Sequence, residues 1–116
     1  KVDTMGIITT VAGSNLSGFD GDGGPATSAK LKQPADVALG PGGVLYIADY
    51  GNHRIRMVDA SGIITTYSGT GTAGYFGDTG LATLAQLNYP VGIVVNSAGD
   101  LFISDRLNHA LRGVGH

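Results

Sequence analysis

The sequence lacks cysteine, tryptophan and glutamate, so all nine of its acidic residues are aspartate. The absence of cysteine excludes a disulfide framework, a cysteine-ligated zinc site and a cysteine nucleophile. Charged residues make up only 14% of the chain and the formal charge is −2. This composition provides no basic surface for a nucleic acid and no polybasic patch for a membrane. No apolar run approaches the roughly 18 residues that a membrane-spanning helix needs.

Glycine, in contrast, is abundant. It accounts for 20 of the 116 residues, more than twice its usual share of about 7%. Good helix formers are scarce beside these turn formers, which argues against a helix bundle. Hydrophobic residues make up 42% of the chain, which argues against disorder. The composition therefore predicts a glycine-rich, mostly β protein.

The chain contains an internal repeat with an offset of 56 residues. The segment Gly6–Thr10 recurs without change as Gly62–Thr66, and matching residues continue along both copies at the same offset. We therefore expect two repeats, approximately at residues 6–61 and 62–116, that together form one portion of a larger architecture.

Each repeat predicts four short strands, because runs rich in Ile, Val and Thr alternate with glycine-containing turns. The segments 25–31 and 81–87 predict short helices of one to two turns. The expected strands are 7–12, 36–39, 44–48 and 53–58 in the first repeat, and 63–68, 92–95, 101–104 and 109–114 in the second.

The strand at 44–48 is apolar on both of its faces, so its sheet must be covered on both sides. The chain has no crossover helices to cover it, and neighbouring sheets of the same kind must do so. Four antiparallel strands per sheet, stacked face to face around an axis, are the blades of a β-propeller. The predicted fold class is therefore all-β, with two propeller blades in this chain.

The motifs of these strands resemble the NHL-repeat family of β-propellers. The resemblance lies in Pro34–Leu39, Gly43–Asp49 and Gly51–Arg56, and the second repeat follows the same pattern. It implies four-stranded blades, usually six to a ring. It does not fix a function, because related propellers bind proteins or RNA, or act as lyases and hydrolases.

If the second strand of each repeat is the innermost strand of a blade, residues 35–68 form one complete blade. Residues 91–114 supply three strands of a second blade without its outer strand, and residues 6–12 are an outer strand without inner strands. We expect the loose strand of one chain to complete the open blade of another. This head-to-tail contact gives a ring or a filament, and three chains would make six blades. The alternative is that the chain is part of a longer propeller.

The loop between the third and fourth strands of each repeat carries the same three polar residues. Carboxylates and imidazoles are suitable ligands for a metal or a small molecule, and a ring would gather these loops around one mouth. The alternative is structural, with each aspartate accepting backbone N–H groups and each asparagine adopting a left-handed turn conformation. The candidate ligand-binding residues are Asp49, Asn52 and His53, repeated as Asp105, Asn108 and His109.

Other polar residues favour structural roles. Asp20 and Asp22 resemble the start of a calcium loop, but the chain has no glutamate to complete one, so we expect no metal site. Arg56 and Arg112 could bind an anion, and we expect them to join adjacent blades instead. The segment that begins at Asn15 is an Asn-Leu-Ser pattern of the kind that accepts N-linked glycans.

These observations predict a non-catalytic propeller module without a cofactor, which acts as a self-associating scaffold and as a surface for a protein or small-molecule ligand. Its expected partners are copies of itself or the rest of a longer propeller, and neither a nucleic acid nor a membrane. One alternative is a fragment of a metal-dependent NHL-type lyase or hydrolase, with His53 and His109 as ligands. Another is a subunit of a head-to-tail filament. The sequence assigns no cellular location, although a secreted one is favoured.

Overall fold

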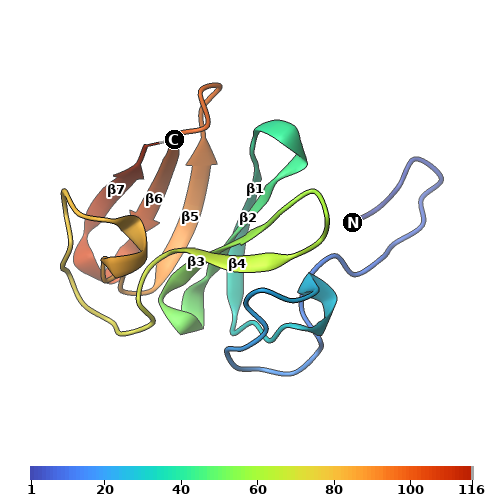
Figure 1. Cartoon of the computed structure of the whole chain (residues 1–116), viewed down its shortest axis with the longest axis horizontal. Coiled ribbons are helices and arrows are strands. Elements are labelled where there is room, and N and C mark those ends of the chain that lie inside the picture. The colour runs from blue at the N-terminus through green and yellow to red at the C-terminus, as the bar shows by residue number, and fades with distance from the viewer. Residues whose placement is uncertain (116) are drawn as a thin grey trace.

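The structure, a computed structural model, describes residues 1–115 and contains two antiparallel β-sheets side by side (Figure 1). Each strand pairs with the next along the chain, so both sheets are meanders of the kind that form propeller blades. This confirms the predicted fold class. His116, at the end of the second expected repeat, lies outside the described residues. The first sheet consists of β1 (Pro34–Leu39), β2 (Leu45–Asp49), β3 (Arg54–Val58) and β4 (Ile64–Ser68), and the second of β5 (Pro90–Val95), β6 (Leu101–Asp105) and β7 (Ala110–Val114).

The helices of the described chain are single 3₁₀ turns, and none is long and apolar enough to cross a membrane. The short helices predicted within 25–31 and 81–87 are present as single turns of three residues each. The carbonyl of Ala26 accepts the N–H of Gly13 and the N–H of Ala26 donates to Gly62, so these groups bond to neighbouring segments. The turns are η1 (Ala26–Ser28), η2 (Pro41–Gly43), η3 (Tyr50–Asn52), η4 (Ala82–Leu84) and η5 (Arg106–Asn108).

The fourth strand of each repeat begins one residue later than predicted. His53 and His109 follow η3 and η5 in the left-handed conformation, with φ values of 53° and 50°. The left-handed position therefore falls on the histidines and not on the asparagines before them. This residue reverses the chain after β2 and β6, so that the next strand can pair antiparallel with the last.

The first predicted strand, at 7–12, is not a strand in this chain. Residues 1–10 instead form an exposed arm that projects away from the sheets (Figure 1). Within the arm, a turn around Asp3 repeats the turn around Asp59 that joins β3 to β4. A single bridge between Val2 and Ile8 is its only ladder contact among the described residues. Among the described residues, no strand of either sheet pairs with this segment.

The main core lies between the two sheets. One face of the first sheet, with Tyr46, Ala48 and Ile55, packs against Ile93 and Ile103 of the second sheet. A second core lies on the opposite face of the first sheet, beneath the long connection at 14–33. It contains Ala26, Ala29, Ile47, Val58 and Ile64.

Replacing Ile103 with alanine tests the core between the sheets. Ile103 is fully buried, so Ile103→Ala should lower the free energy of unfolding by about 2–5 kcal/mol. The matched control is Leu84→Ser, because Leu84 is exposed and Ser28 occupies its place in the first repeat. The control should change stability by less than about 0.5 kcal/mol in urea unfolding. Equal losses in both variants would contradict this core.

Candidate functional site

Arg56 on β3 is the centre of the largest polar network in the first sheet, and its side chain is fully buried. Nη1 donates to Asp49 Oδ2 at 3.0 Å and to the carbonyl of Lys30 at 3.1 Å. Nε and Nη2 donate to Asp22 Oδ1 at 3.1 and 2.9 Å, and Nη2 also donates to the carbonyl of Asp20. The guanidinium thus joins the long connection to its own sheet, whereas the sequence interpretation assigned it to the contact between blades.

Arg112 repeats this network on β7 with less cover. It donates to Asp78 Oδ1 and to Asp105 Oδ2, both at 2.9 Å. The side chain of Asp78 is 61% exposed, compared with 34% for Asp22. In the first sheet Thr66 of β4 donates to Asp22, and the described part of the second sheet has no strand at that position.

The carboxylates of Asp49 and Asp105 point inward and are fully buried. Asp49 Oδ1 accepts the N–H of Lys32 at 2.8 Å, and Oδ2 accepts Asn52 Nδ2 at 2.8 Å as well as Arg56. Asp105 and Asn108 make the same set of contacts. Each aspartate therefore accepts a backbone N–H from the connection 17 residues earlier in the chain, rather than from its own turn.

His53 lies at the junction of the two sheets. Its Nδ1 accepts the N–H of Tyr89 at 3.1 Å, and its ring meets the Tyr89 ring edge-on at 4.4 Å. The Tyr50 ring lies 4.7 Å from that of Tyr89, and Arg106 Nη1 donates to the Tyr50 hydroxyl at 2.7 Å. Burial, and secondarily the charge of Lys32, lowers the pKa of His53 below its usual value. Sequence reasoning missed Tyr50, Tyr89 and Arg106, although the repeat aligns Tyr50 with Arg106.

The acidic residues of the connection bind protein groups. Asp20 Oδ1 accepts the N–H of Lys30 at 2.8 Å, and Asp22 pairs with Arg56. Within residues 1–115 there is no group of three or more His, Cys, Asp or Glu side chains that could hold a metal ion.

The free edge of β7 forms one wall of an open slot. This pocket, of about 350 Å³, lies between β7 and the connection at 77–82. In the first sheet β4 occupies the same place, where Ile64 exchanges backbone hydrogen bonds with Gly23 and Gly24 at 2.7 and 3.0 Å. The repeat counterparts of these two glycines are Thr79 and Gly80. The slot therefore lies where β4 lies in the first sheet.

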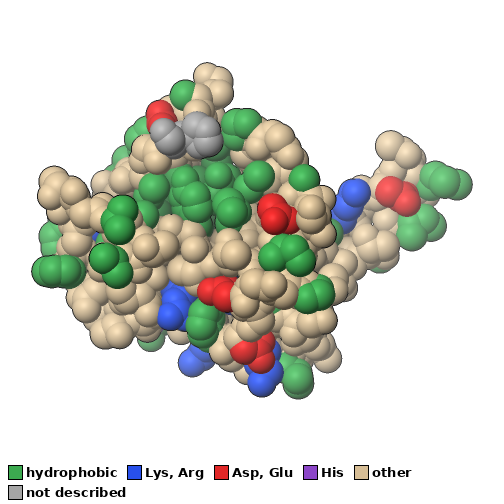
Figure 2. Space-filling model, in the orientation of Figure 1, with side chains coloured by type: hydrophobic (Ala, Val, Ile, Leu, Met, Phe, Trp, Pro, Cys, Tyr) green, Lys and Arg blue, Asp and Glu red, His purple; other side chains and the backbone are tan. Residues whose placement is uncertain are grey.

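Both outer faces of the pair of sheets expose apolar side chains. On the first sheet, Val37 and Leu39 are exposed beside a pocket of about 850 Å³ that reaches Leu45 and the arm. On the second sheet, Val94 and Leu111 are exposed. Figure 2 shows further hydrophobic side chains along the projecting arm. Each outer face of the pair of sheets thus carries apolar side chains that the described chain leaves exposed.

Comparisons with known proteins agree with this fold. The family model described as NHL repeat matches residues 31–56 and 87–113. Teneurin-1 of Mus musculus is 43% identical over 68 residues, which cover 50% of this chain and 2% of the teneurin. NHL repeat-containing protein 2 of Homo sapiens is 32% identical over 101 residues, which cover 84% of this chain and 14% of that protein. A solved structure described as an auxiliary nutrient binding protein, from Bacteroides thetaiotaomicron, superimposes with a TM-score of 0.70 at 30% identity and covers 90% of this chain and 28% of its own.

The sheets are thus blades of the β-propeller type, and the matched segments contain β1, β2 and the start of β3 in one repeat and β5, β6 and most of β7 in the other. The chain belongs to the NHL-repeat family. It spans 2% and 14% of the length of the two curated relatives, so it corresponds to a small part of each. The fold supports a binding or scaffold module.

The arginine networks make a stability prediction. Arg56→Met leaves Asp49 buried without its cationic partner and should cost about 3–5 kcal/mol of unfolding free energy. Arg112→Met also removes the partner of the buried Asp105, but it should cost less because water reaches Asp78 more readily than Asp22. Urea unfolding measures both, with the exposed Leu84→Ser as the control. A larger loss for Arg112→Met than for Arg56→Met would contradict the role of β4 as cover.

His53 makes a prediction about pH. Its pKa is lower in the folded chain than in the unfolded chain, where it is about 6.5. As the pH falls below about 6.5, the unfolded state therefore binds more protons than the folded state. The stability that is present above pH 6.5 is then progressively lost. His53→Asn keeps an acceptor for Tyr89 and suits a left-handed backbone, so it should flatten the pH dependence of the melting temperature between about pH 7 and 5. His109→Asn retains His53 and should keep the slope. Equal slopes in the wild type and His53→Asn would refute this assignment.

Proposed function

We propose that this chain is a non-catalytic scaffold and binding module that associates head to tail with further copies of itself. The observation that carries the proposal is a match between a free strand and a vacant slot. Residues 6–10 repeat the sequence of residues 62–66, which include the start of β4, yet they lie in an exposed arm. The slot beside β7 has the place of β4 in the second sheet.

Within the arm, Ile8 already makes a bridge of the same kind as the one that it would make in the slot. In the first sheet Ile64 pairs with Val58, and the repeat counterparts of these residues are Ile8 and Val114. In the arm, Ile8 pairs with Val2, which is the other counterpart of Val58. Insertion into a second copy therefore exchanges one exposed bridge for a full strand pairing, and it buries Ile8, which is 77% exposed in the single chain.

The two outer faces carry apolar side chains at the positions that pack together at the junction inside the chain. The inner junction packs Tyr46 and Ile55 against the second sheet. Their counterparts on the free face of the second sheet are Phe102 and Leu111, and both are exposed. The free face of the first sheet offers Val37 and other aliphatic side chains in return. A second copy can thus continue the same packing.

Polar contacts of the inner junction recur in the same arrangement. Arg106 bonds to Tyr50 within the chain, and Arg106 of one copy would meet Tyr50 of the next. His53 accepts the N–H of Tyr89, and His109 would accept that of Gln33, which shares the left-handed backbone of Tyr89. These contacts are heterologous, so the assembly closes into a ring or extends as a filament. Three copies complete six blades.

A ring would gather the loops that carry His53 and His109 around one mouth, where a protein or small molecule could dock. The solved structure at 30% identity, described as an auxiliary nutrient binding protein, supports a binding role for such a surface. In this proposal the aspartates and arginines hold the loops and the ligand contacts the exposed side chains beside them.

Solution mass tests the self-association. The wild-type chain should show a mass above its 11.8 kDa monomer that rises with concentration and stops at three copies in a ring. Ile8→Asp and Leu111→Asp should each shift the chain to the monomer, because each places a charge in an apolar contact. Leu84→Ser is the control and should associate like the wild type. Sedimentation velocity measures the mass, and electron microscopy separates rings from fibres.

A wild-type chain that stays monomeric at all concentrations would refute the scaffold proposal. Stoichiometric zinc or calcium in the purified protein, lost on His53→Ala, would favour a fragment of a metal-dependent enzyme instead.

A further inference from the structure

Arg54 and Gly71 lie in close contact in the first sheet. The guanidinium of Arg54, at the start of β3, lies over the Phe19 ring with Cζ 3.5 Å from its centroid. Its Nη2 donates to the carbonyl of Thr70 at 2.7 Å. The next residue, Gly71, also lies close to the guanidinium. A Cβ on Gly71 would lie 2.6 Å from Nη2 and 2.7 Å from Cζ. A side chain at position 71 would therefore push the end of Arg54 away from its bond to Thr70.

The two positions that match this pair at the offset of 56 residues carry other residues. The counterpart of Arg54 is Ala110, at the start of β7, and the counterpart of Gly71 is Asn15, just beyond the arm. Asn15 has a φ of 70° and Gly71 a φ of 89°, so both residues have a left-handed φ and Asn15 adds a side chain. The matching pair thus has a short side chain on the strand, Ala110, and a larger one on the connection, Asn15.

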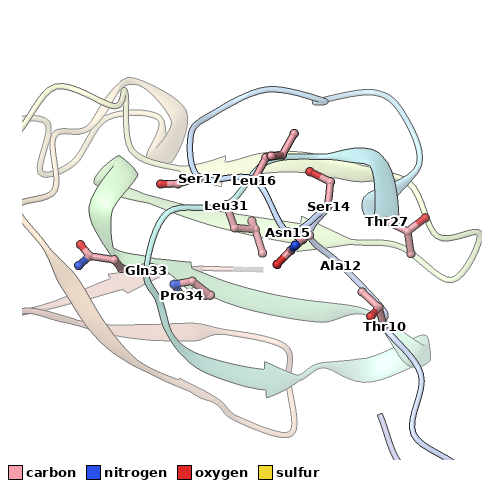
Figure 3. Close-up of a pocket in the computed structure, with 11 residues that line it drawn as sticks. Thr10, Ala12, Ser14, Asn15, Leu16, Ser17, Thr27, Leu31, Gln33 and Pro34 are labelled. Atoms are coloured by element: carbon pink, nitrogen blue, oxygen red, sulfur yellow. The ribbon is translucent and has the colours of Figure 1, made fainter.

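Asn15 lines an open pocket of about 750 Å³ between the segments at 10–17 and 27–34 (Figure 3). Gly13 lines this pocket, and its counterpart 56 residues later is Gly69. Gly69 lies against the backbone of His53 and Arg54, so the start of β3 fills the corresponding place there. The hydroxyl of Ser14 is buried in the same region and has no hydrogen-bond partner in the described chain. The pocket therefore lacks the start of a strand like β3.

We propose that Asn15 of one copy packs on Ala110 of a second copy, and that this pair selects the partner and sets the register of the donated strand. The inference rests on the proposed function, because it takes the second copy as the occupant of the pocket. Continuity with the inner junction supports this occupant, since β7 would enter the pocket as β3 enters its counterpart. Ala110 leaves the room that Asn15 needs, whereas an arginine there would meet the Cβ of Asn15.

Binding of synthetic peptides to the full-length chain tests the pair. The probes are residues 6–17 with the natural sequence and the same peptide with Asn15→Gly, each labelled for fluorescence anisotropy. The acceptors are the wild-type chain and Ala110→Arg, both kept dilute so that the arm does not compete. The natural peptide should bind Ala110→Arg about tenfold more weakly than the wild type, because the added side chain overfills the contact. The Asn15→Gly peptide should recover that loss on Ala110→Arg, since the pair then copies Gly71 and Arg54.

The outcomes separate the two proposals. If the natural peptide binds both acceptors equally, or if Asn15→Gly does not restore binding, the pair does not select the strand and this inference fails while strand donation stands. If neither peptide binds the wild-type chain, strand donation fails and the inference fails with it. Circular dichroism of Ala110→Arg must match that of the wild type. In sedimentation, the Ala110→Arg chain should associate more weakly than the wild type, and the Asn15→Gly, Ala110→Arg double variant should recover.

Discussion

Arg56 and Arg112 each hold a glycine-rich connection against the third strand of a sheet, and the other contacts of the blade depend on this arrangement. A connection with so many glycines has a large conformational entropy to lose and little side-chain surface to bury. The guanidinium supplies charge-assisted bonds to carboxylates and carbonyls along that connection. With the connection fixed, a strand-wide space remains beside the third strand. β4 fills this space in the first sheet, and it is vacant in the second.

The repeat with its offset of 56 residues gives two sheets that are not equally complete, one with four strands and one with three. Each sheet is apolar on both faces, so a single pair of sheets buries one junction and leaves two faces open. Stability in such an array comes from nearest-neighbour interfaces, and terminal units remain incomplete unless they are capped. The described residues include no cap on either face. The exposed arm, the vacant slot and the open faces are therefore consequences of the same repeat.

The repeat and the two-sided burial of the strand at 44–48 were sufficient to predict the sheets, because both follow from patterns along the chain. The conformation of His53 was missed, since left-handed residues are more often asparagine and the preceding residue is Asn52. The short turns at 26–28 and 82–84 depend on backbone bonds to distant segments, which no local pattern shows. In the candidate site, the repeated aspartates were found, but their inward orientation depends on Arg56 and Arg112, which arrive from a neighbouring strand.

The inner junction and the proposed junction between copies are not equally strong. Within the chain, Asp36 Oδ2 accepts the N–H of Ile93 at 2.8 Å and fastens the innermost strands of the two sheets together. The counterpart of Asp36 on the free face is Gly92, which has no side chain to offer to the N–H of Val37. In the proposed assembly, a junction between copies would lack this bond and would rely on apolar packing, the donated strand and the polar contacts of Arg106 and His109. The contact between copies in this assembly would therefore be weaker than the inner junction, and dilution would separate the copies before either sheet unfolds.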